Sequence, residues 1–236
     1  MDQHVDTLLP GMWLSDLIIE FFFAYLFDKL PERIQNKISL LYPSVTYFVA
    51  TFDTLEASIS LANEHLSEKD VVFIPVTNNP DPTRVGGTHW SLLVFCRKAS
   101  FFGKFFCQKL ESTTSSNNDY PVFVHFDSSS GLNLSAAKLF IKKISPIVAP
   151  SCPEPSIFSP IVPQQVNGSD CGVYVLAFAE YLCDELVAGN DIKIDEMAQI
   201  ITPKYIKELR RKTYEIIQRL SKERNDESKK EDEKND

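Results

Sequence analysis

The sequence predicts an α+β fold, and three observations support this prediction. A helical pattern comes first, three strand patterns follow close together, and helical patterns return toward the C-terminus. This order differs from the regular alternation of strands and helices in parallel α/β folds. In addition, 44% of the 236 residues are hydrophobic, which is enough apolar material for a sizeable core.

The first helix is expected over residues 16–27, with Ser15 or Asp16 at its start. Short polar side chains at this position can cap the free backbone N–H groups of a helix. The apolar run contains Glu20 and is too short to span a bilayer. No basic segment or small-residue cleavage site precedes it, so we expect a soluble protein without a signal peptide.

Three short segments, residues 71–76, 89–95 and 122–127, are apolar and rich in β-branched or aromatic side chains. Such segments are typical of buried strands. Residues 78–87 form a turn signal rich in proline and glycine between the first two strands. Residues 96–121 connect the last two strands and are expected to contain an exposed polar loop.

Three more helices are expected after the strands. Residues 135–144 have amphipathic spacing, and residues 172–187 are apolar nearly all round, which is typical of a buried helix. Gly189 follows as a stop signal. The last helix begins at Thr202 and Pro203, because threonine caps helices and proline fits the first position.

The chain is expected to form a single domain over residues 1–221, because no internal repeat or long linker divides it. Residues 222–236 are almost all charged and are expected to form a disordered tail or a frayed helix end. No oligomer signal is visible, so a monomer is expected.

The net charge is −8, and no stripe of lysine or arginine stands out. An acidic surface repels phosphate groups, so we expect neither a nucleic acid nor an anionic membrane as partner. A basic protein or peptide segment fits the charge better.

The cysteines indicate free thiols in a reducing compartment, either the cytoplasm or the nucleus. Their number is odd and no pair has CxxC spacing. Zinc-site spacing and glycine-rich phosphate loops are also missing from the sequence, so no metal or cofactor is expected. The five positions are Cys96, Cys107, Cys152, Cys171 and Cys183.

Cys171 is the candidate nucleophile. A polar turn delivers it to the start of the buried helix, where the helix dipole and free N–H groups favour thiolate over thiol. Gly172 is expected to let a substrate backbone approach closely. Cys183, by contrast, lies deep in the same helix and is expected to be a buried structural residue.

A thiolate nucleophile needs a histidine partner. His89 opens a strand directly after a glycine turn, a common place for a catalytic side chain. His125 lies in mid-strand and is expected to be a core histidine. His4 is expected in a floppy N-terminus, and His65 on a solvated face.

Two further polar residues complete the candidate set. Asp127 ends its strand, where its carboxylate could accept from the imidazole N–H and fix its tautomer. Gln165 lies six residues before Cys171, and its amide could donate to an oxyanion together with the Cys171 N–H. Each assignment alone is weak. The order His, Asp, Gln, Cys, with each residue at a turn or a strand end, is stronger evidence for a catalytic set.

These motifs resemble the Ulp/SENP family of ubiquitin-like-protein proteases. The similar segments are GGTHWSLLVF (residues 86–95), HFDS (residues 125–128), PQQVNGSDCGVYV (residues 163–175) and WLSD at the N-terminus. The resemblance runs from about residue 12 to about residue 220. It implies a papain-like α+β fold, in which helices flank a small central mixed sheet.

The resemblance also implies roles for individual residues. Cys171 would be the nucleophile, His89 the general acid and base, Asp127 its orienting partner and Gln165 the oxyanion donor. Two tryptophans, Trp13 and Trp90, would line a slot that only a Gly-Gly tail can enter. Asp16 would meet a basic residue of the substrate tail.

Within the family, the sequence looks most similar to the Nedd-specific branch. This similarity implies a thiol protease that acts on precursors and conjugates of a Nedd-type modifier. SUMO specificity is the runner-up. A binding module without catalysis is disfavoured because all four catalytic positions are intact, and an acyltransferase because it needs no Gly-Gly slot.

Two departures from the family pattern stand out. The connection over residues 96–121 is long and contains aromatic residues, so it either contacts a partner or is a neutral insertion. In WLSD, Ser15 replaces the family's asparagine. Either residue can cap a helix, so this change carries little weight.

Overall fold

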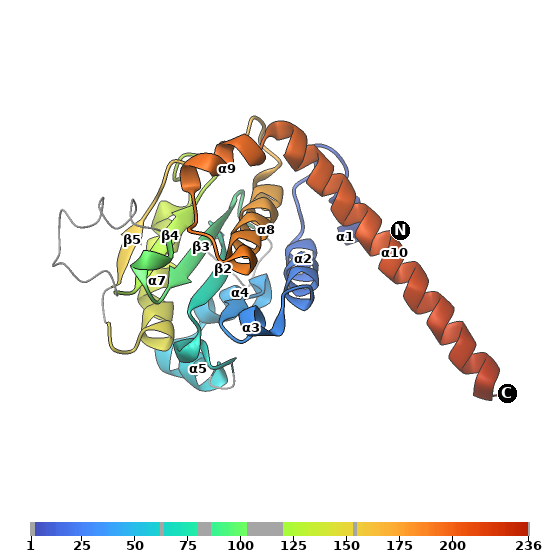
Figure 1. Cartoon of the computed structure of the whole chain (residues 1–236), viewed down its shortest axis with the longest axis horizontal. Helices are drawn as coiled ribbons and strands as arrows, with labels where there is room; N and C mark the ends of the chain where they lie inside the picture. The colour runs from blue at the N-terminus through green and yellow to red at the C-terminus, as the bar shows by residue number, and fades with distance from the viewer. Residues whose placement is uncertain (1–2, 62–63, 80–85, 103–119, 153–154, 236) are drawn as a thin grey trace.

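The computed structural model describes residues 3–61, 64–79, 86–102, 120–152 and 155–235, with side chains given through residue 226. Its centre is a five-stranded mixed sheet in the order β1-β2-β3-β4-β5 (Figure 1). The three central strands are antiparallel, and the outer two pair in parallel with their neighbours. The strands are β1 (Ile38–Leu40), β2 (Val71–Thr77), β3 (Trp90–Cys96), β4 (Val122–Phe126) and β5 (Ser156–Phe158).

The three predicted strands are confirmed to within one residue at each end, as β2, β3 and β4. Two strands, β1 and β5, were not predicted. Each has only three residues and lies at an edge of the sheet. A run this short has no periodicity that distinguishes it from a loop.

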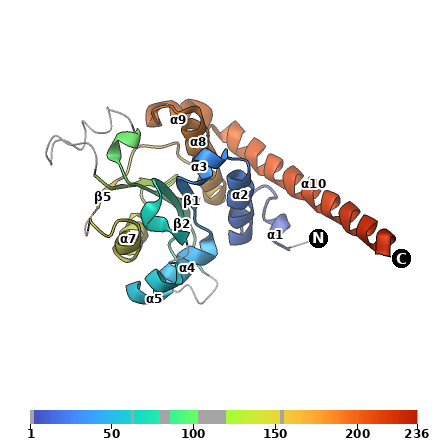
Figure 2. The same cartoon turned by 60° about the horizontal axis from the view of Figure 1, so that its bottom comes forward.

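Helices cover both faces of the sheet (Figure 2). One face packs against α2 (Asp16–Asp28), α8 (Cys171–Ala188) and the start of α10 (Pro203–Asn235). The other packs against α4 (Pro43–Thr51), α5 (Thr54–Ser60) and α7 (Leu134–Val148). Burial on both faces explains why the central strands are apolar throughout, without alternation.

Short elements complete the described chain. They are α1 (Gln3–Asp6), α3 (Glu32–Gln35), α9 (Ile194–Ile200) and two turns of 3₁₀ helix, η2 (Leu66–Glu68) and η3 (Ala99–Phe102). The predicted loop over residues 96–121 lies mostly outside the described residues. Its aromatic residues from 103 onward belong to that part.

Helix α8 confirms the predicted buried helix. It spans 18 residues and ends at Gly189, which adopts the left-handed conformation with φ +70°. Helix α7 is longer than predicted, because it continues through Pro146. A proline lacks an N–H and usually ends a helical pattern, so the sequence indicated an earlier end.

The start of α10 is also confirmed, since the Tyr205 N–H donates to Thr202 Oγ1 at 3.2 Å. Residues 222–236 were expected to form a disordered tail or a frayed helix end, and α10 continues over residues 222–235 as helix. Lysine, arginine and glutamate have high helix propensity, and pairs such as Arg219–Glu223 support the helix four residues apart. Within the described residues, no helix has the length and apolar character needed to cross a membrane.

Candidate active site

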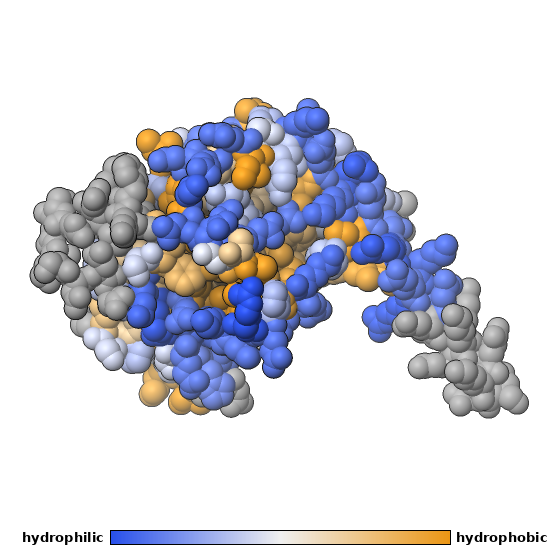
Figure 3. Space-filling model, viewed as in Figure 1, coloured by the Kyte–Doolittle hydropathy of each residue, from blue (hydrophilic) through white to orange (hydrophobic). Residues whose placement is uncertain are grey.

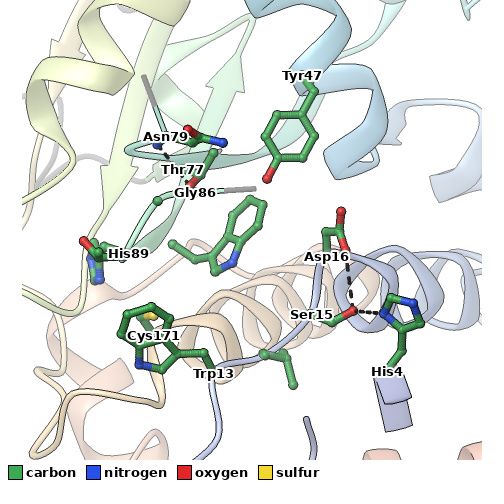
Figure 4. A pocket seen from close by; sticks show the side chains of 14 residues that line it. His4, Trp13, Ser15, Asp16, Tyr47, Thr77, Asn79, Gly86, His89 and Cys171 are labelled. Atoms are coloured by element: carbon green, nitrogen blue, oxygen red, sulfur yellow. Dashed lines mark hydrogen bonds between the residues drawn. The ribbon is translucent and has the colours of Figure 1, made fainter. Parts of the chain in front are cut away.

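A cleft of about 720 Å³ opens beside the N-terminal end of α8 (Figure 4). Its walls come from the segment before α2, from α4, from the facing ends of β2 and β3, and from α8. Segments far apart in the sequence therefore meet around one space. The lining residues are His4, Trp13, Leu14, Ser15, Asp16, Tyr47, Thr77, Asn79, Gly86, Gly87, Thr88, His89, Trp90 and Cys171.

His89 and Asp127 form a buried pair at one end of the cleft. His89 Nε2 lies 2.6 Å from Asp127 Oδ1, and both side chains are almost fully buried. Asp127 accepts two further hydrogen bonds, from the N–H groups of Ser129 and Asn133. Three donors thus converge on one carboxylate and fix its orientation.

These donors keep Asp127 ionised. Burial alone would raise the pKa of Asp127, but the hydrogen bonds from His89, Asn133 and Ser129 outweigh burial and hold the pKa below its ordinary value. A charged acceptor at this position fixes the imidazole ring and its tautomer.

His89 is held in its protonated form. Burial favours the neutral ring, but the hydrogen bond to Asp127 and the interaction with Cys171 outweigh it and raise the pKa of His89 to about 9. Because Nε2 binds Asp127, Nδ1 is the nitrogen left for the thiol. Figure 4 shows the imidazole and the thiol at the same end of the cleft.

Cys171 is the first residue of α8, as predicted, and only 3% of its surface is exposed. Gly172 also has a packing role. A Cβ atom at Gly172 would lie 2.7 Å from Cβ of Leu14, so this glycine allows close packing of the N-terminal segment, while the approach of a substrate backbone stays a prediction.

The two tryptophans line the cleft, as the resemblance implied. Trp13 is 56% exposed and donates from Nε1 to the Gly168 carbonyl at 2.9 Å. Trp90 is half-buried, and its ring meets Tyr47 edge-on at 6.2 Å between centroids. Asp16 lies farther along the same cleft (Figure 4). Side chains rich in apolar surface thus remain open to solvent beside the nucleophile.

Gln165 does not line the cleft. Its Nε2 donates to the Asn167 carbonyl at 2.6 Å, and its Oε1 accepts from Ser128 Oγ at 2.9 Å. The amide is therefore engaged within its own loop and with the loop after β4. One of the two Nε2 hydrogens is therefore occupied. The predicted donation from Gln165 to an oxyanion stays a prediction.

Comparison with known proteins settles the family. The model of the Ulp1 protease family, C-terminal catalytic domain, matches residues 13–224. The chain belongs to the Ulp1 protease family. This membership makes it a cysteine peptidase domain and confirms the family that the sequence motifs indicated.

Curated relatives of this Ulp1-family chain include two sentrin-specific proteases. The probable sentrin-specific protease 8 of Dictyostelium discoideum is 31% identical over 93% of both chains. The human sentrin-specific protease 8 is 30% identical over 93% of this chain and 92% of its own. The NEDD8-specific protease 1 of Arabidopsis thaliana is 29% identical over 94% and 89%.

Solved structures support the Ulp1-type fold. The SUMO protease Ulp1, with its catalytic cysteine oxidised to a sulfenic acid, has a TM-score of 0.64 at 19% identity, over 91% of this chain and 81% of its own. A de-sumoylating protease has a TM-score of 0.61 at 17% identity, over 98% and 90%. The predicted α+β class, with a mixed sheet between helices, is confirmed.

Several residues of this Ulp1-type site escaped the sequence analysis. Tyr47 lies on α4. The sequence did not indicate a role in the site, because a tyrosine in an apolar helix is typical of a core residue. Asn78 was visible only as part of a turn, yet its Oδ1 accepts from the N–H groups of Thr88 and His89. His4 was expected in a floppy terminus, but it lies in α1 with Nδ1 2.9 Å from Ser15 Oγ.

The start of α2 also differs in detail from the prediction. Ser15 occupies the N-cap position, but its side chain makes no capping bond. Asp16 Oδ1 instead accepts from the N–H of Leu17. The hydroxyl of Ser15 faces His4, which accounts for the missing cap.

Asn133 is a fully buried residue behind the His89–Asp127 pair. Its backbone N–H donates to Asp127 Oδ2 at 3.0 Å, and its Nδ2 lies 3.2 Å from the His89 carbonyl and 3.1 Å from Ser91 Oγ. His125 shares this network through Ser91 Oγ and is a buried core histidine, as expected.

The other cysteines that the structure describes have no comparable setting. Cys96 and Cys183 are buried, and burial raises the pKa of both thiols. Cys152 is half-buried at the other end of the sheet, and Cys107 lies outside the described residues. Across the part of the chain that the structure describes, no cluster of histidine, cysteine or carboxylate side chains could hold a metal ion.

Proposed function

We propose that this chain is a thiol peptidase and isopeptidase that cleaves after the C-terminal Gly-Gly of a Nedd-type modifier. It would act on modifier precursors and on conjugates with lysine. The observation that carries the proposal is the buried His89–Asp127 pair next to Cys171, at the end of a cleft that Trp13 and Trp90 line.

The chemistry follows from these positions. Cys171 Sγ attacks the carbonyl carbon of the terminal glycine, and a tetrahedral intermediate forms. When the C–N bond breaks, imidazolium His89 gives its proton to the leaving amine. The neutral ring then takes one proton from water as the water oxygen attacks the thioester. The C–S bond breaks and releases the Cys171 thiolate and the glycine carboxyl group, which loses its remaining proton to solvent.

The choice of substrate is proposed to come from the cleft. Trp13 and Trp90, which line it, would form a slot between flat rings that excludes any residue with a side chain, so that glycine is selected by exclusion. Asp16 lies farther along the cleft and is proposed to pair with a basic residue of the modifier tail. The relatives' names include both NEDD8-specific and sentrin-specific proteases, so the choice of modifier is the point to test.

The test uses Nedd, SUMO and ubiquitin probes that carry a thiol-reactive group at the C-terminus. We expect rapid labelling by the Nedd probe alone, and none in Cys171→Ala. Cys152→Ala is the matched control, because this cysteine is outside the cleft, and it should label like the native chain. Labelling by SUMO alone would keep the chemistry and overturn the specificity.

A further inference from the structure

A buried arginine joins three distant parts of the chain. Arg210 lies on α10 and is only 5% exposed. Its Nη1 donates to the carbonyls of Thr7 at 2.7 Å and Leu9 at 3.3 Å. Its Nη2 donates to the carbonyl of Met12 at 3.1 Å, to that of Ser169 at 3.4 Å and to Asp170 Oδ1 at 2.7 Å.

The partners of Arg210 are direct neighbours of the site residues. Met12 precedes Trp13, and Asp170 precedes Cys171 in the chain. One planar guanidinium therefore contacts the segment that carries a wall of the cleft and the turn that delivers the nucleophile. The bond from Trp13 Nε1 to the Gly168 carbonyl links the same two segments a second time.

Asp170 is fixed on both sides of its carboxylate. Oδ1 accepts from Arg210, and Oδ2 accepts from Asn167 Nδ2 at 2.8 Å. The Asn167 Oδ1 in turn accepts from the N–H groups of Ser169 and Asp170. The turn before Cys171 is thus closed upon itself, and Arg210 connects it to α10 and to the segment before α2.

Packing alone does not account for an arginine here. The other buried residues on this face of α10 are uncharged, namely Ile206, Leu209, Thr213 and Ile216. A buried ion pair is often no more stabilising than apolar residues of similar size. Arginine differs from them in one respect, since its fork can hold several carbonyls and a carboxylate in fixed directions.

We propose that Arg210 is a positioning residue that holds the Trp13 wall and the Cys171 turn in their reactive arrangement. The proposal rests on the function proposed above. Misplacement of reacting groups by about 1 Å can lower a rate about 100-fold. Loss of the guanidinium should therefore affect both substrate binding at Trp13 and attack by Cys171.

The experiment compares Arg210→Met with Arg211→Met in the full chain. Arg211 is the adjacent residue of α10, and its exposed side chain pairs with Glu215 four residues on. We expect Arg210→Met to lower kcat and raise KM for a modifier–fluorophore substrate, with kcat/KM falling about 10- to 100-fold. Arg211→Met should leave both constants unchanged.

Two readouts separate positioning from folding and from substrate identity. The first is the pH profile of iodoacetamide alkylation at Cys171, which needs no modifier and should shift in Arg210→Met. The second is amide hydrogen exchange over residues 7–13, which should become faster. Both are measured at least 15 °C below the melting temperature of each variant.

Unchanged alkylation, exchange and kcat/KM in folded Arg210→Met would overturn the inference. If this variant does not fold, Asp170→Asn serves instead, since it keeps the guanidinium and weakens one contact. An unchanged alkylation profile in Asp170→Asn would overturn the inference about Arg210. A native chain that no modifier probe labels refutes the proposed function alone, because alkylation still reports on Arg210.

Discussion

His89 and His125 are both buried, and their protonation states differ. His89 contacts the carboxylate directly, which with Cys171 raises its pKa to about 9. His125 contacts the hydroxyl of Ser91, and burial lowers its pKa to about 4. Contacts with Asp127 and Cys171 thus give His89, and not His125, a proton at neutral pH.

The pKa of His89 predicts an alkaline limit for activity. Imidazolium supplies the proton for the leaving amine, so kcat/KM should fall as pH rises through about 9. In Asp127→Asn the main partner that raises this pKa is lost, so the limit should move to lower pH. The rate at pH 7 should drop about 100-fold or more. A limit that stays at the same pH would contradict the assignment of Asp127.

His125 predicts an acid sensitivity of stability. Its pKa is lowered in the folded state, so the unfolded chain binds the proton first as pH falls below about 6.5. Stability should therefore decline between pH 6.5 and pH 4, by about 1 kcal/mol per pH unit from this group. Urea unfolding of native chain and His125→Gln at pH 7 and pH 5 measures it. An equal loss in both would contradict the prediction.

At the scale of elements, the start of α8 is shaped by its contact with the segment before α2. A side chain at Gly172 would meet Leu14, which is buried next to Trp13. Alanine favours helices by about 1 kcal/mol over glycine, so without this contact Gly172→Ala would be stabilising. The contact with Leu14 makes the expected effect of Gly172→Ala on stability destabilising.

We predict that Gly172→Ala destabilises the protein by about 1–3 kcal/mol, because overpacking has this cost. Activity should fall as well, since Leu14 and Trp13 are displaced together. Thermal melting and kcat/KM are the measurements. As a control, Gly168→Ala should keep the native melting temperature, because a Cβ atom there meets nothing within 4 Å.

The elements that the sequence predicted well are those with a long uniform pattern. Helix α8 and the central strands have continuous apolar runs, and α10 has a threonine and proline at its start. Strands β1 and β5 were missed because three residues carry no period. They form only where a neighbouring strand offers free backbone groups, which is a tertiary effect.

At the scale of the molecule, α10 extends away from the body as a 33-residue helix (Figures 1 and 3). Only its first part packs, and from Gln218 through Asp226 every side chain is exposed. At about 1.5 Å per residue the helix is about 50 Å long. The N-terminal part of α10 therefore packs into the core, and residues 218–226 present mostly charged and polar side chains to solvent.

Removal of residues 222–236 should therefore leave the melting temperature within about 2 °C and kcat/KM unchanged, since the described side chains of this part are exposed and an exposed ion pair such as Arg219–Glu223 contributes little. Removal of residues 203–236 takes Ile206, Leu209 and Arg210 and should abolish folding. Melting curves of both truncations test this. A large loss in the shorter truncation would show that the projecting part has a structural role.

Site residues could be predicted where their sequence neighbours indicate the role, and could not where the role depends on residues far away in the sequence. Cys171 and His89 were visible because each stands at a turn next to a regular element. Arg210 and Asn133 were not visible. An arginine in a helix is usually exposed to solvent, and an asparagine in a turn is usually explained by the turn itself. Their roles depend on contacts that only the folded chain creates.

The contacts of Arg210 also set the order in which the site can be completed during synthesis. The guanidinium binds Thr7, which is 203 residues earlier in the chain. A ribosome has therefore made Trp13, His89, Asp127 and Cys171 before it makes the residue that fastens their segments together. Nascent chains that end before Arg210 carry every reacting group but lack these contacts, so the proposed activity should arise only after Arg210 has been made.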